Sequence, residues 1–284
     1  MNRRMSFLEK IMTYAILILF AVLILYPIVY LIFSSFKTNS EIYVDPANFI
    51  PKQFTFENYQ KLFASDGFDF WRMLGNSLFY AGWNIIMGIL LATTGAYVFA
   101  RGEFPGKKAI FIAFTALMFV SPGAITIYCT FDIIRALGMT PSLLTMLIKG
   151  LFGVPVVSYY MVKGYIDTLP RDLDESAKID GCSFIGTFFR IILPLLKPIV
   201  ATMAIFSFQG SWNNYTGVLM WTSSRPQDWT LTVGIMMMRN SGDAAIGVGF
   251  TMAAAVFAII PVLAVFIAFN KFIVDGIAAG AVKG

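Results

Sequence analysis

Four carboxylates lie close together in the loop at residues 163–197, at Asp172, Asp174, Glu175 and Asp180. Asp172 followed three residues later by Glu175 is a variant of the capping box, which predicts that a helix begins here. This helix is acidic, although the chain as a whole has a net charge of +5. The chemistry that it offers is recognition by charge, so we expect it to dock against a cytoplasmic partner.

The predicted acidic helix is short. Gly181 should end it after about two turns, because glycine adopts a left-handed conformation without strain. Such a helix is marginal in water, so another surface must hold it. Ala177 is small enough for that surface to approach closely, and Leu173 lies on the same face. The alternative is a helix lying on the membrane surface, but such helices usually carry Lys and Arg on their polar face. Ser183 is predicted to cap a second helix that continues into the next apolar segment.

Polar and aromatic side chains gather in the apolar segment at residues 195–221. Unpartnered polar groups are costly in lipid, and a sugar needs hydrogen-bonding groups together with flat aromatic faces. The alternative is that Asn and Gln join neighbouring helices through hydrogen bonds. A second polar set, Asn76, Asn84, Thr93 and Thr94, lies in the segment at 74–100. The candidate residues of a substrate pathway are Gln209, Trp212, Asn213, Asn214 and Tyr215.

Lys149 is the one charge in the apolar segment at residues 143–162. An ionisable residue inside a membrane segment is a functional-site hypothesis by default. At ~1.5 Å per residue, Lys149 should lie roughly 10 Å below the outer end of its helix. The alternative is that its side chain extends to the outer headgroups.

Covalent and metal chemistry is not expected of this chain, because it has no His and only two Cys, Cys129 and Cys182. These counts disfavour an intramembrane enzyme, a zinc site and a disulfide framework. The turn at residues 101–108 superficially resembles a P-loop, but only three residues separate its glycines, and neither Ser nor Thr follows the lysine. The energy for any active process must therefore come from another chain.

The elements that must position these residues are six apolar segments. The sequence is 58% hydrophobic and 13% charged, whereas a soluble domain has about 25% charged residues. About 20 apolar residues suffice to cross the hydrocarbon core. We therefore predict an all-α membrane protein with six transmembrane helices. Their predicted ranges are 11–36, 74–100, 109–131, 143–162, 195–221 and 249–272. No Asp or Glu lies in these ranges, which disfavours a stand-alone carrier coupled to ions.

The Lys and Arg residues indicate the orientation. With the N-terminus inside, thirteen of the 21 fall in inner segments, seven fall in outer segments, and Lys149 falls in a helix. An excess of cations marks the cytoplasmic side, so both termini are predicted to be cytoplasmic. The first apolar run is too long for the ~7–15 residues of a signal-peptide core, and no A-x-A site follows it. We therefore expect it to be a retained first helix.

The acidic loop carries a longer pattern. Residues 175–181 read Glu-Ser-Ala-x-x-Asp-Gly, and nine residues later 191–194 read Ile-x-Leu-Pro. Both parts and their spacing resemble the EAA loop of ATP-binding-cassette importer permeases, with Ser176 in place of the usual first Ala. In that family the loop is a coupling helix seated in a cleft of the ATPase subunit. The resemblance implies ATPase-coupling roles for Asp172, Leu173, Glu175, Ser176, Ala177, Asp180, Gly181, Leu193 and Pro194.

The resemblance covers nearly the whole chain. Residues 212–215, Trp-Asn-Asn-Tyr, resemble a motif of the sugar-importer branch, and residues 276–284 resemble the tail of the maltose-type second permease subunit. In the family that tail reaches between the ATPase subunits, which implies such a contact for Gly280, Lys283 and Gly284. The implied fold is that of a type I importer permease. Its implied parts are an N-terminal cytoplasmic segment with the first helix (1–36), an outer loop (37–71), a core permease domain (72–272) that includes the loop at 163–197, and a cytoplasmic tail (273–284).

The resemblance also implies partners and a location. These are a second homologous permease subunit, two ATPase subunits, an extracytoplasmic solute-binding protein and the lipid of a bacterial or archaeal inner membrane. ATP and Mg would be held by the ATPase subunits, with no cofactor in this chain and no nucleic acid. The expected function is ATP-driven import of a sugar or oligosaccharide by alternating access. A polyol or glycerol phosphate is the alternative substrate, and a stand-alone carrier or channel is the alternative class.

Overall fold

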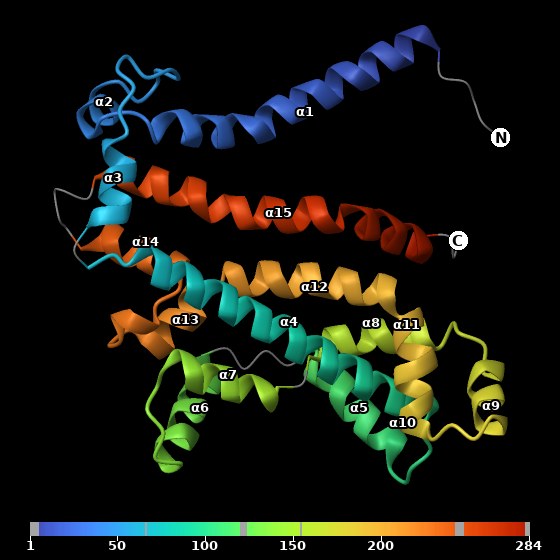
Figure 1. The fold of residues 1–284 in the computed structure, drawn as a ribbon. Helices are drawn as coiled ribbons and strands as arrows, with labels where there is room; N and C mark the ends of the chain where they lie inside the picture. The colour runs from blue at the N-terminus through green and yellow to red at the C-terminus, as the bar shows by residue number, and fades with distance from the viewer. Residues whose placement is uncertain (1–5, 66, 120–123, 154, 242–246, 282–284) are drawn as a thin grey trace. The chain divides into compact units, whose positions relative to one another are not determined.

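A computed structural model describes residues 6–65, 67–119, 124–153, 155–241 and 247–281, with side chains through Phe269. Every regular element in these ranges is a helix (Figure 1), which confirms the predicted all-α class. The chain divides into two compact units, and each is described by itself. The first comprises Met1–Phe70 with Gly234–Pro261, and the second comprises Trp71–Val233 with Val262–Gly284.

The first unit contains α1 (Phe7–Ser34), α2 (Asn39–Val44) and α3 (Glu57–Ala64), with parts of α14 (Leu231–Asn240) and α15 (Val248–Ala281). A capping box begins α1, in which Ser6 and Glu9 satisfy each other's backbone amides. The segment predicted as an outer loop is thus partly helical. The Asn58 amide anchors it by donating to the carbonyls of Ser35 and Lys37, both at 2.8 Å.

The second unit is built on α4 (Phe70–Arg101). Small side chains on α4, including Ala92 and Ala96, allow close packing against Tyr159 and Val162, and all four are buried. Tyr159 also donates a 2.9 Å hydrogen bond to the carbonyl of Gly95. The other helices of this unit are α5 (Lys107–Leu117), α6 (Ala124–Ala136), α7 (Leu143–Leu151), α8 (Val156–Ile166), α9 (Asp172–Ile179), α10 (Phe184–Thr187), a π-helix (Phe188–Ile192), α11 (Leu193–Leu195), α12 (Lys197–Trp212), α13 (Tyr215–Thr222) and a 3₁₀ turn (Pro226–Asp228).

Four helices in the described part of the chain are long and apolar enough to cross a membrane, at Phe7–Ser34, Phe70–Arg101, Leu143–Ile166 and Val248–Phe269. A fifth candidate is the pair Phe184–Leu195 and Lys197–Trp212, which is bent by 77°. The predicted helix at 109–131 corresponds to α5 and α6, on either side of residues 120–123, which lie outside the described residues. Six spans therefore remain a prediction.

Two predicted helices are divided in the structure. The segment at 143–162 breaks between α7 and α8, where its sequence has Gly153 and Pro155, as expected from those residue types. The segment at 195–221 was predicted as one helix, but α12 ends at Trp212. Asn214 then caps α13 by accepting from the Gly217 amide at 3.0 Å. Asn competes with the helical backbone in this way, which makes it a better cap than an interior residue.

Candidate functional site

The acidic helix predicted from the sequence is α9 (Asp172–Ile179). The predicted capping box is wrong, because Arg171 holds the cap position without a side-chain cap and Asp172 is already helical. Three of the four acidic residues, Asp172, Asp174 and Glu175, lie in the first turn, where the helix dipole favours negative charge. Asp180 is the C-cap residue at the other end. Gly181, with φ +77°, ends the helix as predicted. The Cys182 amide bonds to the Ala177 carbonyl at 2.8 Å, and the Gly181 amide to that of Lys178 at 3.1 Å, which is a Schellman motif.

An ion pair fastens α9 to the end of α4. Arg101 Nε lies 2.9 Å from Asp174 Oδ2, and the two side chains are only 7% and 21% exposed. The same guanidinium donates to the carbonyls of Ile166 at 3.2 Å and Leu169 at 2.7 Å, so it also fixes the chain that leads into α9. Tyr97 adds a 3.1 Å hydrogen bond from its hydroxyl to Asp174 Oδ1. We call Tyr97, Arg101 and Asp174 the tether.

The sequence interpretation did not assign a role to the tether residues. Arg101 was counted only as a cation that marks the inner side, and Asp174 only as part of the acidic charge. Arg101 and Asp174 have opposite charges and could form an ion pair. They are 73 positions apart, however, and nothing in the sequence shows that they meet. An aromatic residue of the loop also holds Tyr97 in place, because the Tyr97 ring stacks on Phe184 at a centroid distance of 4.5 Å.

The coupling residues predicted on α9 divide into two faces. Ala177 is 2% exposed, so within this chain the surface that approaches it closely is the chain's own. Leu173 is half-buried. The residues open to a partner are Asp172, Glu175, Ser176, Asp180 and Gly181. Ile179, which is 87% exposed, adds an apolar contact point to this outer face.

Leu193 and Pro194 lie in α11, just before the 77° bend into α12. Leu193 packs against the buried cluster around α4 and α8, so these two residues shape the end of the loop rather than the outer face of α9. Of the predicted tail residues, Gly280 lies in α15, whereas Lys283 and Gly284 lie outside the described residues.

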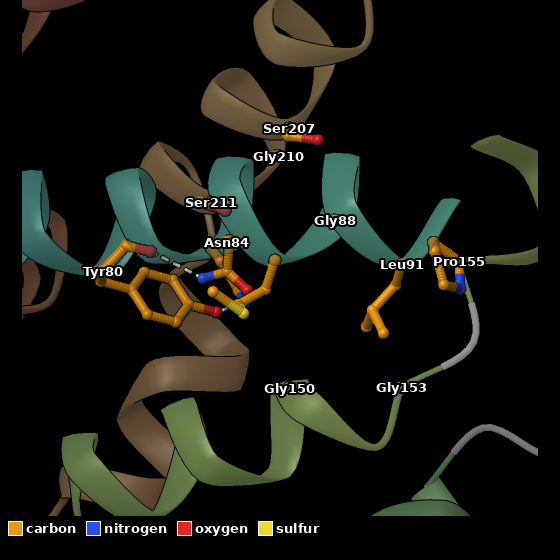
Figure 2. A pocket seen from close by; sticks show the side chains of 12 residues that line it. Tyr80, Asn84, Gly88, Leu91, Gly150, Gly153, Pro155, Ser207, Gly210 and Ser211 are labelled. Carbon is orange, nitrogen blue, oxygen red and sulfur yellow. Dashed lines mark hydrogen bonds between the residues drawn. The ribbon is translucent and has the colours of Figure 1, made fainter. Parts of the chain in front are cut away.

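A pocket of about 420 Å³ lies between α4, the α7–α8 break and α12 (Figure 2). Its polar groups come from Tyr80 and Asn84 on α4, Ser207 and Ser211 on α12, and Asn214. Asn214 donates to the Tyr80 hydroxyl at 3.0 Å, and Asn84 donates to the Tyr80 carbonyl at 2.7 Å. The pocket therefore offers hydroxyl and amide groups together with one aromatic ring.

The predicted pathway residues reach this pocket only in part. Asn214 lines it, as the substrate-pathway prediction requires, and also bonds across helices, as the helix-joining alternative requires. Trp212 is 4% exposed and stacks on Phe208 at 5.3 Å. Gln209 and Asn213 are exposed, and Tyr215 is half-buried. Tyr80, Gly88 and Gly150 line the pocket but were not predicted to do so. For Gly150, a signal was its residue type, because glycine close to Gly153 and Pro155 disfavours a continuous helix.

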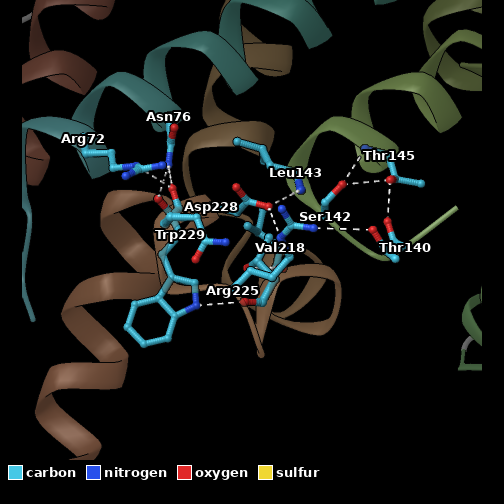
Figure 3. Close-up of polar contacts among 12 residues, drawn as sticks. Arg72, Asn76, Thr140, Ser142, Leu143, Thr145, Val218, Arg225, Asp228 and Trp229 are labelled. Carbon is cyan, nitrogen blue, oxygen red and sulfur yellow. Dashed lines mark hydrogen bonds and ion pairs between the residues drawn. The ribbon is translucent and has the colours of Figure 1, made fainter.

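A polar network fixes the segment after α13 to α4 and α7 (Figure 3). The Asn76 amide donates to the carbonyls of Gln227 at 3.0 Å and Trp229 at 2.9 Å. Arg225 Nε pairs with Asp228 Oδ2 at 3.1 Å. The polar character of Asn76, noted as a pathway possibility, is therefore explained by structure, because its amide satisfies two backbone carbonyls.

Lys149 lies in the last turn of α7, with Nζ 5.6 Å from the centroid of the Trp221 ring. This distance is typical of a cation–π contact. Trp221 stacks in turn on Phe131 at 4.8 Å. The next residue, Asp132, lies within α6, whereas the sequence interpretation ended the third helix at Phe131. If the third membrane segment extends to the end of α6, it contains one carboxylate, Asp132, where the sequence analysis expected none.

The sequence matches the family described as "binding-protein-dependent transport system inner membrane component" over residues 84–278. The chain belongs to this family. A galactooligosaccharides transport system permease protein of Bacillus subtilis is 33% identical over 98% of this chain and 97% of its own length. An arabinooligosaccharides transport system permease protein of the same organism is 31% identical over 93% and 92%. A sulfoquinovosyl glycerol transport system permease protein of Agrobacterium fabrum is 30% identical over 92% and 89%.

A solved bacterial ABC transporter involved in alginate import contains a chain of the same fold. The TM-score is 0.83, with 21% identity, and the match covers 95% of this chain and 99% of that one. The family match and the relatives above confirm the resemblance to importer permeases that was expected from the sequence. The members compared are transport permeases, which agrees with the expectation of a transport protein rather than an enzyme.

Proposed function

We propose that this chain forms half of the membrane pathway of an ATP-driven importer for a sugar or oligosaccharide. It would cross the inner membrane six times with both termini in the cytoplasm. A second homologous permease, two ATPase subunits that hold ATP and Mg, and a solute-binding protein would complete the importer. The substrate class is supported by relatives named for galactooligosaccharides and arabinooligosaccharides, and by a pocket of hydroxyl and amide groups beside Tyr80.

The observation that carries the proposal is that a single helix, α4, both lines the pocket and holds the coupling helix α9. Tyr80, Asn84 and Leu91 of α4 line the pocket, and Arg101 at the end of the same helix holds α9. From Asn84 to Arg101 the helix axis spans ~26 Å, at 1.5 Å per residue. A helix that is packed along its length moves as a rigid body. A displacement of α9 by the ATPase would therefore reach the pocket.

The outer face of α9 supplies the contact with the ATPase. Asp172, Glu175 and Asp180 are exposed and acidic, with the apolar Ile179 among them. Exposed charge around an apolar centre is the usual composition of a protein interface. The tether leaves this face free, because Asp174 is turned toward α4.

Substitution of Glu175 tests the assignment. Glu175→Lys should reduce association with the ATPase subunits by about tenfold or more, because it places a cation in the acidic face. The control is Glu103→Lys, which makes the same change at an exposed residue of the turn after α4. Association is measured by co-purification and by titration, and membrane insertion should persist in both variants. Equal association of Glu175→Lys and wild type would refute the docking role of α9.

A further inference from the structure

A second pocket, of about 270 Å³, lies where α4 and α8 end and α5 begins. Four of its lining residues are cations, namely Lys107, Lys108, Lys163 and Arg171, and Asp167 is the single carboxylate. The roles proposed above for the exposed face of α9, the tether and the substrate pocket do not involve these charges. We call it the cationic pocket.

The charges of the cationic pocket are only partly neutralised. Lys163 pairs with Asp167 at 2.7 Å, and Lys107 Nζ donates to the Gly102 carbonyl at 2.8 Å. Within the described residues, no ion pair involves Lys108 or Arg171, and both are exposed. Like charges held together without a counter-ion raise the local potential, so the pocket favours an anion.

The surroundings of the pocket are apolar. Phe99 and Phe111 form part of its wall, and Lys163 Nζ lies 5.1 Å from the Phe111 ring centroid. On α5, on either side of Phe111 in the sequence, Ile110 is 41% exposed and Ile112 is 67% exposed. A ligand that combines an anionic head with apolar tails would satisfy both the cations and these exposed side chains.

We infer that the cationic pocket binds the phosphodiester headgroup of an anionic phospholipid. Basic pockets between membrane helices on the cytoplasmic side suit such headgroups, and this pocket lies at the inner ends of α4 and α8 in the proposed orientation. The inference rests on the membrane placement in the proposed function, but not on the substrate. Arg171 lines the pocket and also precedes α9, so a bound lipid would lie directly beside the coupling loop.

Lipid binding by the purified full-length chain tests this inference. Native mass spectrometry in detergent measures retention of phosphatidylglycerol against phosphatidylcholine. We expect phosphatidylglycerol to be retained preferentially. Lys108→Gln should weaken it about fivefold, because a cation beside an anionic headgroup contributes about that factor, and adding Lys163→Gln should weaken it further. Lys108→Arg, which keeps the charge, should bind as wild type does.

The control is Lys10→Gln, which removes an exposed cation from the first turns of α1. If Lys10→Gln and Lys108→Gln lose equal affinity, or if wild type does not prefer phosphatidylglycerol, the inference is wrong. If inorganic phosphate displaces the lipid at comparable concentrations, the site binds free anions instead of headgroups. If Lys108→Gln keeps lipid but loses ATPase association, the pocket is a protein-docking surface. Because lipid retention is measured without transport, its failure is separable from failure of the proposed import function.

Discussion

Arg101 makes more contacts than would be needed if it only marked the cytoplasmic side of the membrane. It pairs with Asp174 and donates to two carbonyls that precede α9, while remaining 7% exposed. A guanidinium suits this position, because it presents several donors in a fixed plane. Its contribution is positional: it keeps the coupling helix at the end of the helix that lines the pocket.

Replacing Arg101 should separate ATPase binding from transport. In Arg101→Met the Asp174 carboxylate loses its partner while largely buried, which costs up to about 3 kcal/mol. We expect ATP-driven uptake to fall strongly while ATPase subunits still bind to the exposed face of α9. The control is Arg190→Met, at an exposed arginine of the loop at residues 163–197. Adding Asp174→Asn to Arg101→Met should restore stability in part. Full uptake by Arg101→Met would contradict the positioning role.

Asn214 has a structural duty in addition to lining the pocket. It caps α13 and donates to Tyr80, so Asn214→Ala should lower stability by about 1 kcal/mol through the lost cap. Asn213→Ala is the matched control, since Asn213 is exposed and directly follows the last residue of α12. Thermal unfolding in detergent measures both variants. Equal melting temperatures for the two would show that the cap is not needed.

At the scale of elements, α9 keeps its position through its two ends. The tether holds its first turn, and the Schellman motif at Gly181 turns the chain toward α10. A Cβ at Gly181 would meet nothing within 4 Å, so only its φ of +77° requires glycine. A Cβ at Gly164 would also meet nothing within 4 Å, and this glycine lies in the last turn of α8, where the backbone is helical.

These two glycines form a matched pair. Gly181→Ala should destabilise the protein by about 1–2 kcal/mol, because it places a side chain in the left-handed region. Gly164→Ala should be neutral or stabilising by up to about 1 kcal/mol, because alanine favours a helix. Thermal unfolding reports both, and uptake should fall only in Gly181→Ala. Destabilisation by Gly164→Ala equal to that by Gly181→Ala would refute the conformational explanation.

Residue patterns predicted the elements better than their contacts. Runs of apolar residues and the position of Gly181 were sufficient to predict the helical class and the end of α9. Asn213 and Asn214 lie within an apolar run, so their sequence predicted one continuous helix at residues 195–221. The structure shows a break there because the Asn214 side chain binds the backbone. The tether could not be predicted, since the pairing of Arg101 with Asp174 depends on how α4 and the loop fold together.

At the scale of the whole molecule, the chain belongs to a family of transport permeases, and we propose that its energy comes from partner ATPase subunits. Its turn at 101–108 lacks the spacing of a P-loop, and its exposed acidic helix is suited to receive force from another protein. The family to which it belongs acts with a binding protein, and the pocket beside α4 would receive what that protein delivers. We therefore expect transport by this chain to require its partner permease, ATPase and binding-protein subunits.

Uptake of a labelled oligosaccharide into liposomes tests this claim most directly. The chain is reconstituted alone, with its partner permease, and with the complete set of permease, ATPase and binding-protein subunits, each with and without internal ATP. Uptake should occur only with the complete set and ATP, and Glu175→Lys should abolish it. Uptake by the chain alone, or uptake independent of ATP, would contradict the account and favour a stand-alone carrier or channel.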